Sequence, residues 1–145
     1  MPVRGRRAAP PDLLVDTSVA VALVVADHEH HESVTRAVGR RRLGLAGHAA
    51  FETFSVLTRL PPPARREPEA VDRVLRAGFP ASRFLGADDT AALLRRLAGL
   101  GIGGGQVYDA LVGATAVAHR LPLATRDARA VDVYRALDVD LVRLD

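Results

Sequence analysis

The 145-residue chain contains no cysteine, and its 20 basic residues are all arginines because lysine is also absent. Without cysteine there is no disulfide bond, no thiolate metal site and no cysteine nucleophile. Long apolar runs are missing too. The longest stretch without a charge or another strong interruption, residues 17–26, is far short of the ~20 apolar residues that a membrane helix needs. We therefore expect neither thiol chemistry nor a membrane span.

A basic segment followed by the apolar run LLVDTSVAVALVVA has the outline of a secretory signal peptide. Asp16 lies in the middle of that run, however, and Pro10, Pro11 and Asp12 interrupt the approach to it. A charge within a translocated segment is costly, so the pattern does not favour secretion. We expect a cytoplasmic protein.

The formal net charge of +3 belongs to the first eleven residues, which contain three arginines and no acid. The 17 arginines and 17 acids of residues 12–145 cancel, so the remainder of the chain is formally neutral. We expect residues 1–11 to be a basic, disordered tail, or an over-long choice of start codon, and residues 12–145 to form one domain. With 48% hydrophobic residues, that length is enough to bury a core.

Short apolar segments alternate with helical patterns along residues 12–145, which is typical of an α/β domain. Strands are expected at 13–15, 43–46, 82–85, 121–125 and 139–144. A first helix is expected to begin at Thr17 or Ser18, and later helices to span 27–42, 51–60, 67–77, 88–100, 107–120 and 128–137. Because such helices must carry the chain across from one strand to the next, the sheet should be mainly parallel.

Four acids occupy positions that a parallel sheet would bring to one edge. Asp16 directly follows a predicted strand and Asp127 comes just after another, whereas Glu52 and Asp109 lie in the first turns of predicted helices. Taken singly, each has a structural explanation, because acids cap helices, favour helix N-termini and occupy solvated helix faces. Asp16 is the hardest to explain in this way, since its neighbours are apolar and a buried unpaired carboxylate is expensive.

Taken together, the four acids indicate a bound cation. Two carboxylates ~5 Å apart repel by about 3 kcal/mol at an effective dielectric constant of ~20, so a fold gathers them only around a positive charge. Oxygen ligands without cysteine suit Mg²⁺ or Mn²⁺. Such an ion activates water and neutralises the charge that develops on a phosphate during transfer.

At these residues the sequence resembles the PIN domain family and, within it, the VapC ribonuclease toxins of bacterial toxin–antitoxin pairs. The resemblance covers residues 12–145 and rests on four segments: LLVDTSV, FETFSVLTRLP, YDALVGATAVAHRLPLATRD and the closing VDLVRLD. It implies a three-layer α/β/α sandwich with a mainly parallel central sheet. The basic tail before Asp12 departs from the usual family pattern.

The resemblance also implies site residues. The near-invariant metal-binding acids of the family are matched by Asp16, Glu52 and Asp109, and its frequent fourth acid by Asp127. The small hydroxyl positions near the site are matched by Thr17, Ser18 and Thr125. Members of the family are Mg²⁺- or Mn²⁺-dependent ribonucleases. The VapC proteins are usually homodimers, and a cognate VapB-type antitoxin neutralises them by covering the active site with its C-terminal segment.

These assignments give a mechanistic hypothesis. A water activated by one or two ions at the four acids would attack an RNA phosphodiester in line and leave a 5′-phosphate and a 3′-hydroxyl. The three hydroxyl residues would orient the water or a carboxylate. Arg126 and Arg129 flank Asp127 in the sequence and are the candidates for contact with the substrate phosphate.

Other conspicuous features are interpreted as structural. The glycine-rich loop 101–106 follows a helix rather than a strand, so it does not fit a dinucleotide-binding fingerprint and indicates a flexible joint before Asp109. The histidine-rich segment 28–32 lacks the second histidine of a zinc-protease motif and is interpreted as a solvated helix start. The arginine run 40–42 suits a helix C-terminus. Six aromatic residues in a chain of 145 give little support for base stacking.

Three alternatives fit less well. A response-regulator receiver needs a late lysine, which this chain lacks, and a haloacid-dehalogenase-type phosphatase needs an aspartate where this chain has Ser18. The third alternative belongs to a different class: a catalytically silent PIN-fold binding module that acts through antitoxin or RNA binding. The intact set of four acids argues against it.

The charge balance gains meaning once the four acids are assigned to a cation. Of the 17 acids in residues 12–145, 13 then remain elsewhere, opposite 17 arginines. An acidic pocket surrounded by a net-positive surface suits a phosphodiester substrate or an acidic antitoxin segment.

Overall fold

The computed structural model describes residues 9–145. All three arginines of the predicted tail lie outside these described residues, so the disorder expected for residues 1–11 stays a prediction. Four short strands form one sheet in the order β2-β1-β3-β4, and every neighbouring pair is parallel. The strands are β1 (Leu13–Val15), β2 (Leu43–Leu45), β3 (Leu123–Thr125) and β4 (Leu141–Arg143). The predicted parallel sheet is confirmed.

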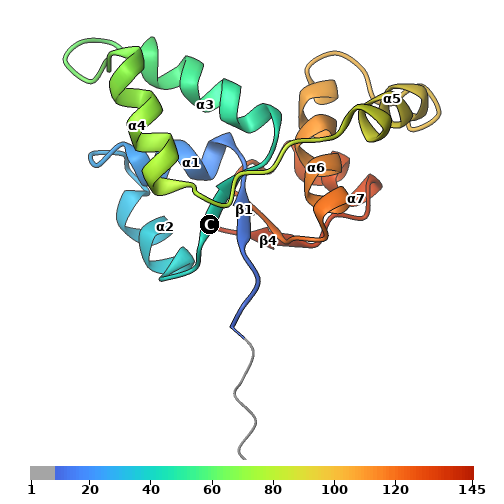
Figure 1. Ribbon diagram of the computed structural model, residues 1–145, viewed down its shortest axis with the longest axis horizontal. Coiled ribbons are helices and arrows are strands. Elements are labelled where there is room, and N and C mark those ends of the chain that lie inside the picture. The colour runs from blue at the N-terminus through green and yellow to red at the C-terminus, as the bar shows by residue number, and fades with distance from the viewer. Residues whose placement is uncertain (1–8) are drawn as a thin grey trace, which may run out of the picture.

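Seven helices in residues 9–145 connect and cover these strands (Figure 1). They are α1 (Thr17–Val24), α2 (His31–Val38), α3 (His48–Thr58), α4 (Pro68–Gly78), α5 (Ala87–Arg96), α6 (Gln106–His119) and α7 (Val131–Ala136). None of these described helices combines the length and the apolar character that crossing a bilayer requires.

The side chains of β1 alternate between two cores, as the two-residue period of a strand requires. Leu13 and Val15 pack with buried residues of α1 and α2, whereas Leu14 packs with Val112 of α6 and Tyr134 of α7. All three β1 residues are exposed by 2% or less. Helices therefore cover both faces of the central sheet, which confirms the predicted α/β/α sandwich.

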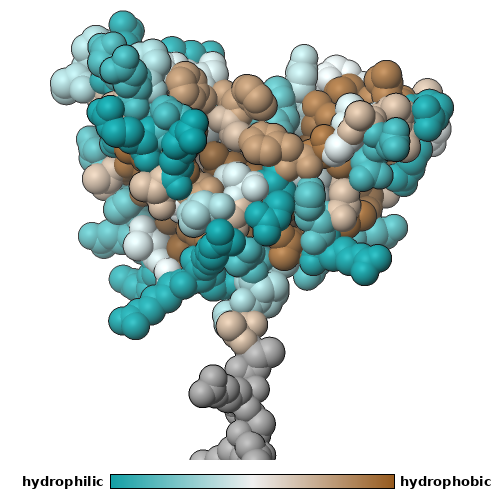
Figure 2. All heavy atoms as spheres, viewed as in Figure 1, coloured by the Kyte–Doolittle hydropathy of each residue, from teal (hydrophilic) through white to brown (hydrophobic). Residues whose placement is uncertain are grey.

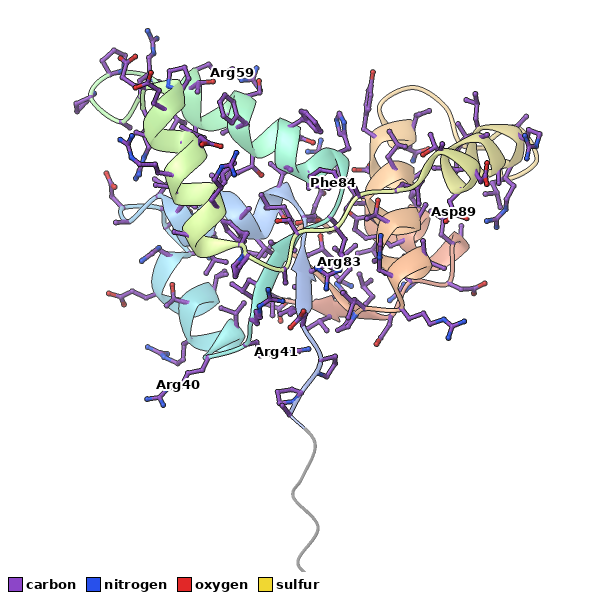
Figure 3. The ribbon with its side chains drawn as sticks, in the orientation of Figure 1. Arg40, Arg41, Arg59, Arg83, Phe84 and Asp89 are labelled. Carbon is purple, nitrogen blue, oxygen red and sulfur yellow. The ribbon has the colours of Figure 1, made fainter. Side chains whose placement is uncertain are left out.

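The helices form two raised groups in the view of Figure 1, with α3 and α4 on the left and α5, α6 and α7 on the right. The extended segment 79–86 runs between the two groups and carries Phe84, labelled in Figure 3. Figure 2 shows apolar atoms gathered where the surface is hollowed between them. A cavity of about 210 Å³ lies here, and its lining includes four apolar residues that we call the notch residues: Phe51, Phe84, Leu85 and Leu111.

The strand predicted at 82–85 is wrong. Within it only Arg83 forms a bridge, to Ala46 just beyond the end of β2. The amide of Leu45 donates a hydrogen bond to Oγ of Ser82 at 2.9 Å, and the amide of Arg83 donates to the carbonyl of Leu45 at 3.1 Å. Because a serine side chain occupies a position that a backbone carbonyl would take in a ladder, the segment lies against β2 without extending the sheet.

Several predicted helix boundaries are also wrong. The helix expected at 27–42 forms only as α2, since turns precede it and Gly39, with a φ of 58°, ends it. A positive φ favours glycine and stops a right-handed helix. The helix expected at 51–60 begins earlier, at His48, whereas those expected at 88–100 and 128–137 shorten to α5 and α7 because their outer residues form turns.

Candidate active site

The four candidate acids line one pocket with a volume of about 310 Å³. Asp16 directly follows β1 and Asp127 comes two residues after β3, neighbouring parallel strands whose carboxyl ends meet at one edge of the sheet. Glu52 reaches the pocket from the second turn of α3, and Asp109 from the first turn of α6. The remaining described residues that line it are Thr17, Ser18, Val21, His28, Val112, Arg126 and Tyr134.

Asp16 is the most buried of the four acids, with 4% of its surface exposed, and its carboxylate accepts four hydrogen bonds. Oδ1 accepts from the hydroxyl of Ser18 and from the amide of Val19, and the bond from Val19 caps α1. Oδ2 accepts from the hydroxyls of Thr125 and Tyr134, the second at 3.0 Å. Asp16 is therefore the N-cap of α1, which begins at Thr17, one of the two expected residues.

Tyr134 belongs to the site although nothing in the sequence pattern indicated it. The residue lies on α7, is 1% exposed, and has its ring in the core and its hydroxyl on Asp16. Its ring lies so close to Gly113 of α6 that a Cβ there would come within 3.1 Å of it. Burial, followed by the charge of Asp16, raises the pKa of Tyr134 far above its ordinary value. The phenol therefore stays protonated and acts as a donor.

Two of the three predicted hydroxyl residues contact a candidate acid directly. Ser18 and Thr125 both donate to Asp16. Each also accepts a backbone amide, Ser18 from Arg126 at 2.8 Å and Thr125 from Asp127 at 3.0 Å. The bonds of Thr125 to Asp16 and of Arg126 to Ser18 attach the end of β3 and the loop after it to the start of α1. The third predicted hydroxyl residue, Thr17, lies in the pocket lining.

The negative charge of the pocket acts on Asp109. Burial raises the pKa of its carboxyl, and the charges of Asp127, Asp16 and Glu52 raise it further, to about 6, against an opposing effect of Arg129. Burial also raises the pKa of Asp16, although the hydrogen bonds it accepts lower it. For Asp109 the effect of the three neighbouring charges, added to that of burial, indicates carboxylates held close together without enough positive charge to offset them.

The donor set fits a divalent cation without forming a tight cage. Among residues 9–145, no three carboxylates or imidazoles come close enough together to enclose an ion as the side chains lie. Mg²⁺ usually keeps several waters and takes only one or two carboxylates directly, so an open pocket of about 310 Å³ suits it. The repulsion that raises the pKa of Asp109 is the property of this pocket that a cation would relieve.

The two arginines that flank Asp127 in the sequence have different surroundings. Arg126 lines the pocket, and its Nε is buried with no hydrogen-bond partner in the part of the chain that the structure describes. The side chain of Arg129 is 96% exposed, with Nε 3.7 Å from Oδ1 of Asp127. The structure brings Arg126 into the pocket and leaves Arg129 outside its lining.

Most of the features interpreted as structural lie away from the acids. Arg42 pairs with Asp12 at 2.9 Å, and both residues precede strands, so the run 40–42 lies at the opposite edge of the sheet (Figure 3). The loop 101–106 leads into α6 and is not part of the described pocket lining. The exception is His28, which lines the pocket although its segment was interpreted as a solvated helix start.

Comparison with known proteins places the chain in a family. The pattern of the PIN domain matches residues 13–136. The chain is also 48% identical over 132 residues to Ribonuclease VapC27 of Mycobacterium tuberculosis (strain ATCC 25618 / H37Rv), a match that covers 91% of this chain and 96% of that protein. The chain belongs to the PIN domain family.

Solved structures agree on the fold. VapC20 of Mycobacterium tuberculosis, described as a sarcin-ricin loop cleaving toxin, superposes with a TM-score of 0.65 at 20% identity, covering 83% of this chain and 94% of that one. A chain of VapBC2 from Rickettsia felis, bound to a DNA fragment from its promoter, gives a TM-score of 0.67 at 13% identity, covering 93% and 100%. At such low identities these likenesses concern the fold alone.

Proposed function

We propose that the chain is a VapC-type endoribonuclease, the toxin of a toxin–antitoxin pair, which hydrolyses RNA phosphodiester bonds with Mg²⁺ or Mn²⁺ as its cofactor. One observation carries the proposal: four carboxylates from four elements meet in one pocket of a chain that is 48% identical to a named ribonuclease. Either feature alone supports a ribonuclease less strongly, because acids also cap helices and a shared fold does not define an activity.

The ligands in this proposal are Asp16, Glu52, Asp109 and Asp127, holding one or two ions. When bound, such an ion lowers the pKa of a coordinated water and neutralises charge that develops on the phosphate. Asp16 would be the best-positioned ligand, because three hydroxyls and one amide fix its carboxylate. Partners that orient a ligand in this way strengthen metal binding.

The reaction in this proposal is an in-line hydrolysis. The oxygen of water bonds to phosphorus, the bond from phosphorus to the O3′ atom breaks, and that oxygen takes a proton, which leaves a 5′-phosphate and a 3′-hydroxyl. Arg126 supports an anionic substrate, since the residue lines the pocket and its Nε–H group lacks a described partner. Planar guanidinium donors are well suited to phosphate oxygens.

The proposal includes two protein partners, a second copy of the chain and a cognate VapB-type antitoxin, all acting in the cytoplasm. The notch residues support a protein contact. Phe51 and Phe84 are 68% and 53% exposed, and their rings meet edge to face with centroids 6.3 Å apart. Exposed apolar patches and aromatic side chains are characteristic of protein interfaces. To test the homodimer, we would measure the mass of the protein by light scattering after size-exclusion chromatography. It should be twice the chain mass of 15.5 kDa.

Metal-dependent RNA cleavage tests the enzymatic part. We would incubate the purified protein with total bacterial RNA in Mn²⁺, in Mg²⁺ or in EDTA, and sequence the new RNA ends. We expect new 5′-phosphate ends only with metal, together with a rise of Tm in Mn²⁺ that Glu52→Gln reduces. A silent binding module would bind RNA or antitoxin without producing new ends, and that result would rule the proposal out.

A further inference from the structure

The acid pocket has a neighbour that the carboxylate site does not account for. His28 lies in the turn between α1 and α2, is half-buried, and lines the same pocket as Asp16 and Glu52. The adjacent histidines have other contacts. Nδ1 of His31 lies 2.8 Å from the carbonyl oxygen of Ala22, a bond that holds the start of α2 against α1. Of the three histidines in this tract, His28 is the one in the lining.

The backbone fixes the protonation pattern of the His28 ring. The amide of His30 donates a hydrogen bond to Nδ1 of His28 at 3.1 Å. A ring nitrogen that accepts a hydrogen bond carries no hydrogen, so in the neutral imidazole the hydrogen is on Nε2. The ring of His30 lies beside that of His28, with centroids 5.9 Å apart, and leaves this hydrogen bond to the backbone amide. His28 therefore presents an oriented N–H donor without needing a positive charge.

Such a donor is scarce in this pocket. Apart from four carboxylates, three hydroxyl residues and two valines, the described lining has only two side chains, His28 and Arg126. These are the two that carry N–H groups. They come from different parts of the chain, the turn after α1 and the loop after β3. An anionic strand that enters a carboxylate-lined pocket needs donors for its phosphate oxygens, and these two residues can supply them.

We propose that His28 binds a non-bridging phosphate oxygen of the RNA substrate through its Nε2–H group, as a second phosphate contact beside Arg126. This inference rests on the proposed ribonuclease function. The tautomer argues against the other role for an imidazole in this place, that of a metal ligand. Nδ1 already accepts from His30, and Nε2 in this tautomer holds a hydrogen instead of a free lone pair. Mg²⁺ in any case prefers oxygen ligands.

The test compares His28→Ala with His28→Gln, whose side-chain amide keeps an N–H donor at a similar reach. His30→Ala is the matched control, because it removes a neighbouring imidazole but keeps the backbone amide on which the His28 ring depends. For His28→Ala we expect KM for RNA to rise about tenfold or more with kcat nearly unchanged, as for the loss of a hydrogen bond to a charged group. His28→Gln should recover most of the loss, and His30→Ala should behave like wild type.

Two further measurements separate this inference from the proposed function. The Tm shift with Mn²⁺ should be the same in His28→Ala and wild type; loss of the shift would make His28 a metal ligand and overturn the inference. Fluorescence anisotropy of a labelled random-sequence single-stranded RNA in Ca²⁺ reports binding without relying on cleavage, and His28→Ala should weaken it about tenfold. If wild type cleaves RNA and His28→Ala matches it in KM and in anisotropy, only this inference fails. If wild type binds but does not cleave, the proposed function fails while the contact stands.

Discussion

The phenolic oxygen of Tyr134 lies 3.0 Å from Oδ2 of Asp16, so the last helix of the fold holds the carboxylate at the end of its first strand. The two residues are 118 positions apart in the sequence. The contact exists because α7 packs on α6 beside β1, with Gly113 leaving room for the ring. Asp16 is therefore the buried acid of the pocket, held by hydrogen bonds, and the other three acids are more exposed.

Replacing Tyr134 by Phe removes one donor from Asp16 and keeps the ring. A hydrogen bond to a charged group contributes about 1.5–3 kcal/mol, so the free energy of unfolding of the metal-free protein should fall by that order near neutral pH. Because the bond from Tyr134 lowers the pKa of Asp16, its loss should move half-maximal Mn²⁺ binding to higher pH. Urea unfolding and Mn²⁺ titrations at several pH values measure both effects. Tyr108→Phe, which alters a ring that is 52% exposed, is the control, and equal behaviour of the two variants would contradict this role.

The stability of the metal-free protein should depend on pH through Asp109. Its pKa is about 6 in the folded protein, against an ordinary value of 3.8, so the folded state binds its proton more tightly than the unfolded state. The stability that this group contributes is therefore complete below the lower value and is lost as pH rises through the higher one. In EDTA, the Tm of wild type should fall relative to Asp109→Asn as pH rises through about 6. A difference between the two proteins that does not change with pH would show that Asp109 is not perturbed.

Arg126 and Arg129 offer a matched pair for the phosphate contact. Arg126 lines the pocket, whereas the side chain of Arg129 is 96% exposed. We expect Arg126→Ala to raise KM for RNA about tenfold or more, and Arg129→Ala to change it less than threefold, because exposed ion pairs contribute little. Steady-state cleavage of one RNA by both variants measures this. A larger rise of KM in Arg129→Ala than in Arg126→Ala would indicate that the RNA binds outside the pocket.

Gly44 should be required for the fold itself. A Cβ at this position of β2 would fall on the backbone of Ala81 and Ser82, which the chain cannot move without displacing the segment 79–86. We expect Gly44→Ala to lose about 1–3 kcal/mol of unfolding free energy or more. At Gly78, where an added Cβ meets nothing within 4 Å, the same substitution should be neutral or stabilise by about 0.5 kcal/mol. Urea unfolding of the two variants compares them, and equal stabilities would contradict the close approach.

The sequence predicted all four acids of the pocket, and two of them follow from the strand ends. Asp16 and Asp127 could be placed together because the carboxyl ends of adjacent parallel strands meet at one edge of a sheet. Tyr134 and His28 could not, since their places depend on how α7 packs on α6 and how the turn before α2 folds over the pocket. The same limit explains the false strand around Ser82, whose side chain replaces a backbone partner that no periodicity reveals.

Asp12 and Asp16 allow the most direct test of the central claim, that the pocket acids perform metal-dependent RNA cleavage. The two residues lie at opposite ends of β1. Asp12 pairs with Arg42 at the far edge of the sheet, a half-exposed pair whose loss should cost no more than about 1 kcal/mol, and Asp16 lies in the pocket. The measurement is cleavage of RNA in Mn²⁺ by Asp16→Asn and Asp12→Asn, with circular dichroism to confirm that both fold. We expect cleavage by Asp16→Asn to fall to the level of the EDTA control, and Asp12→Asn to cleave like wild type. Cleavage by folded Asp16→Asn at the wild-type rate would contradict the central claim.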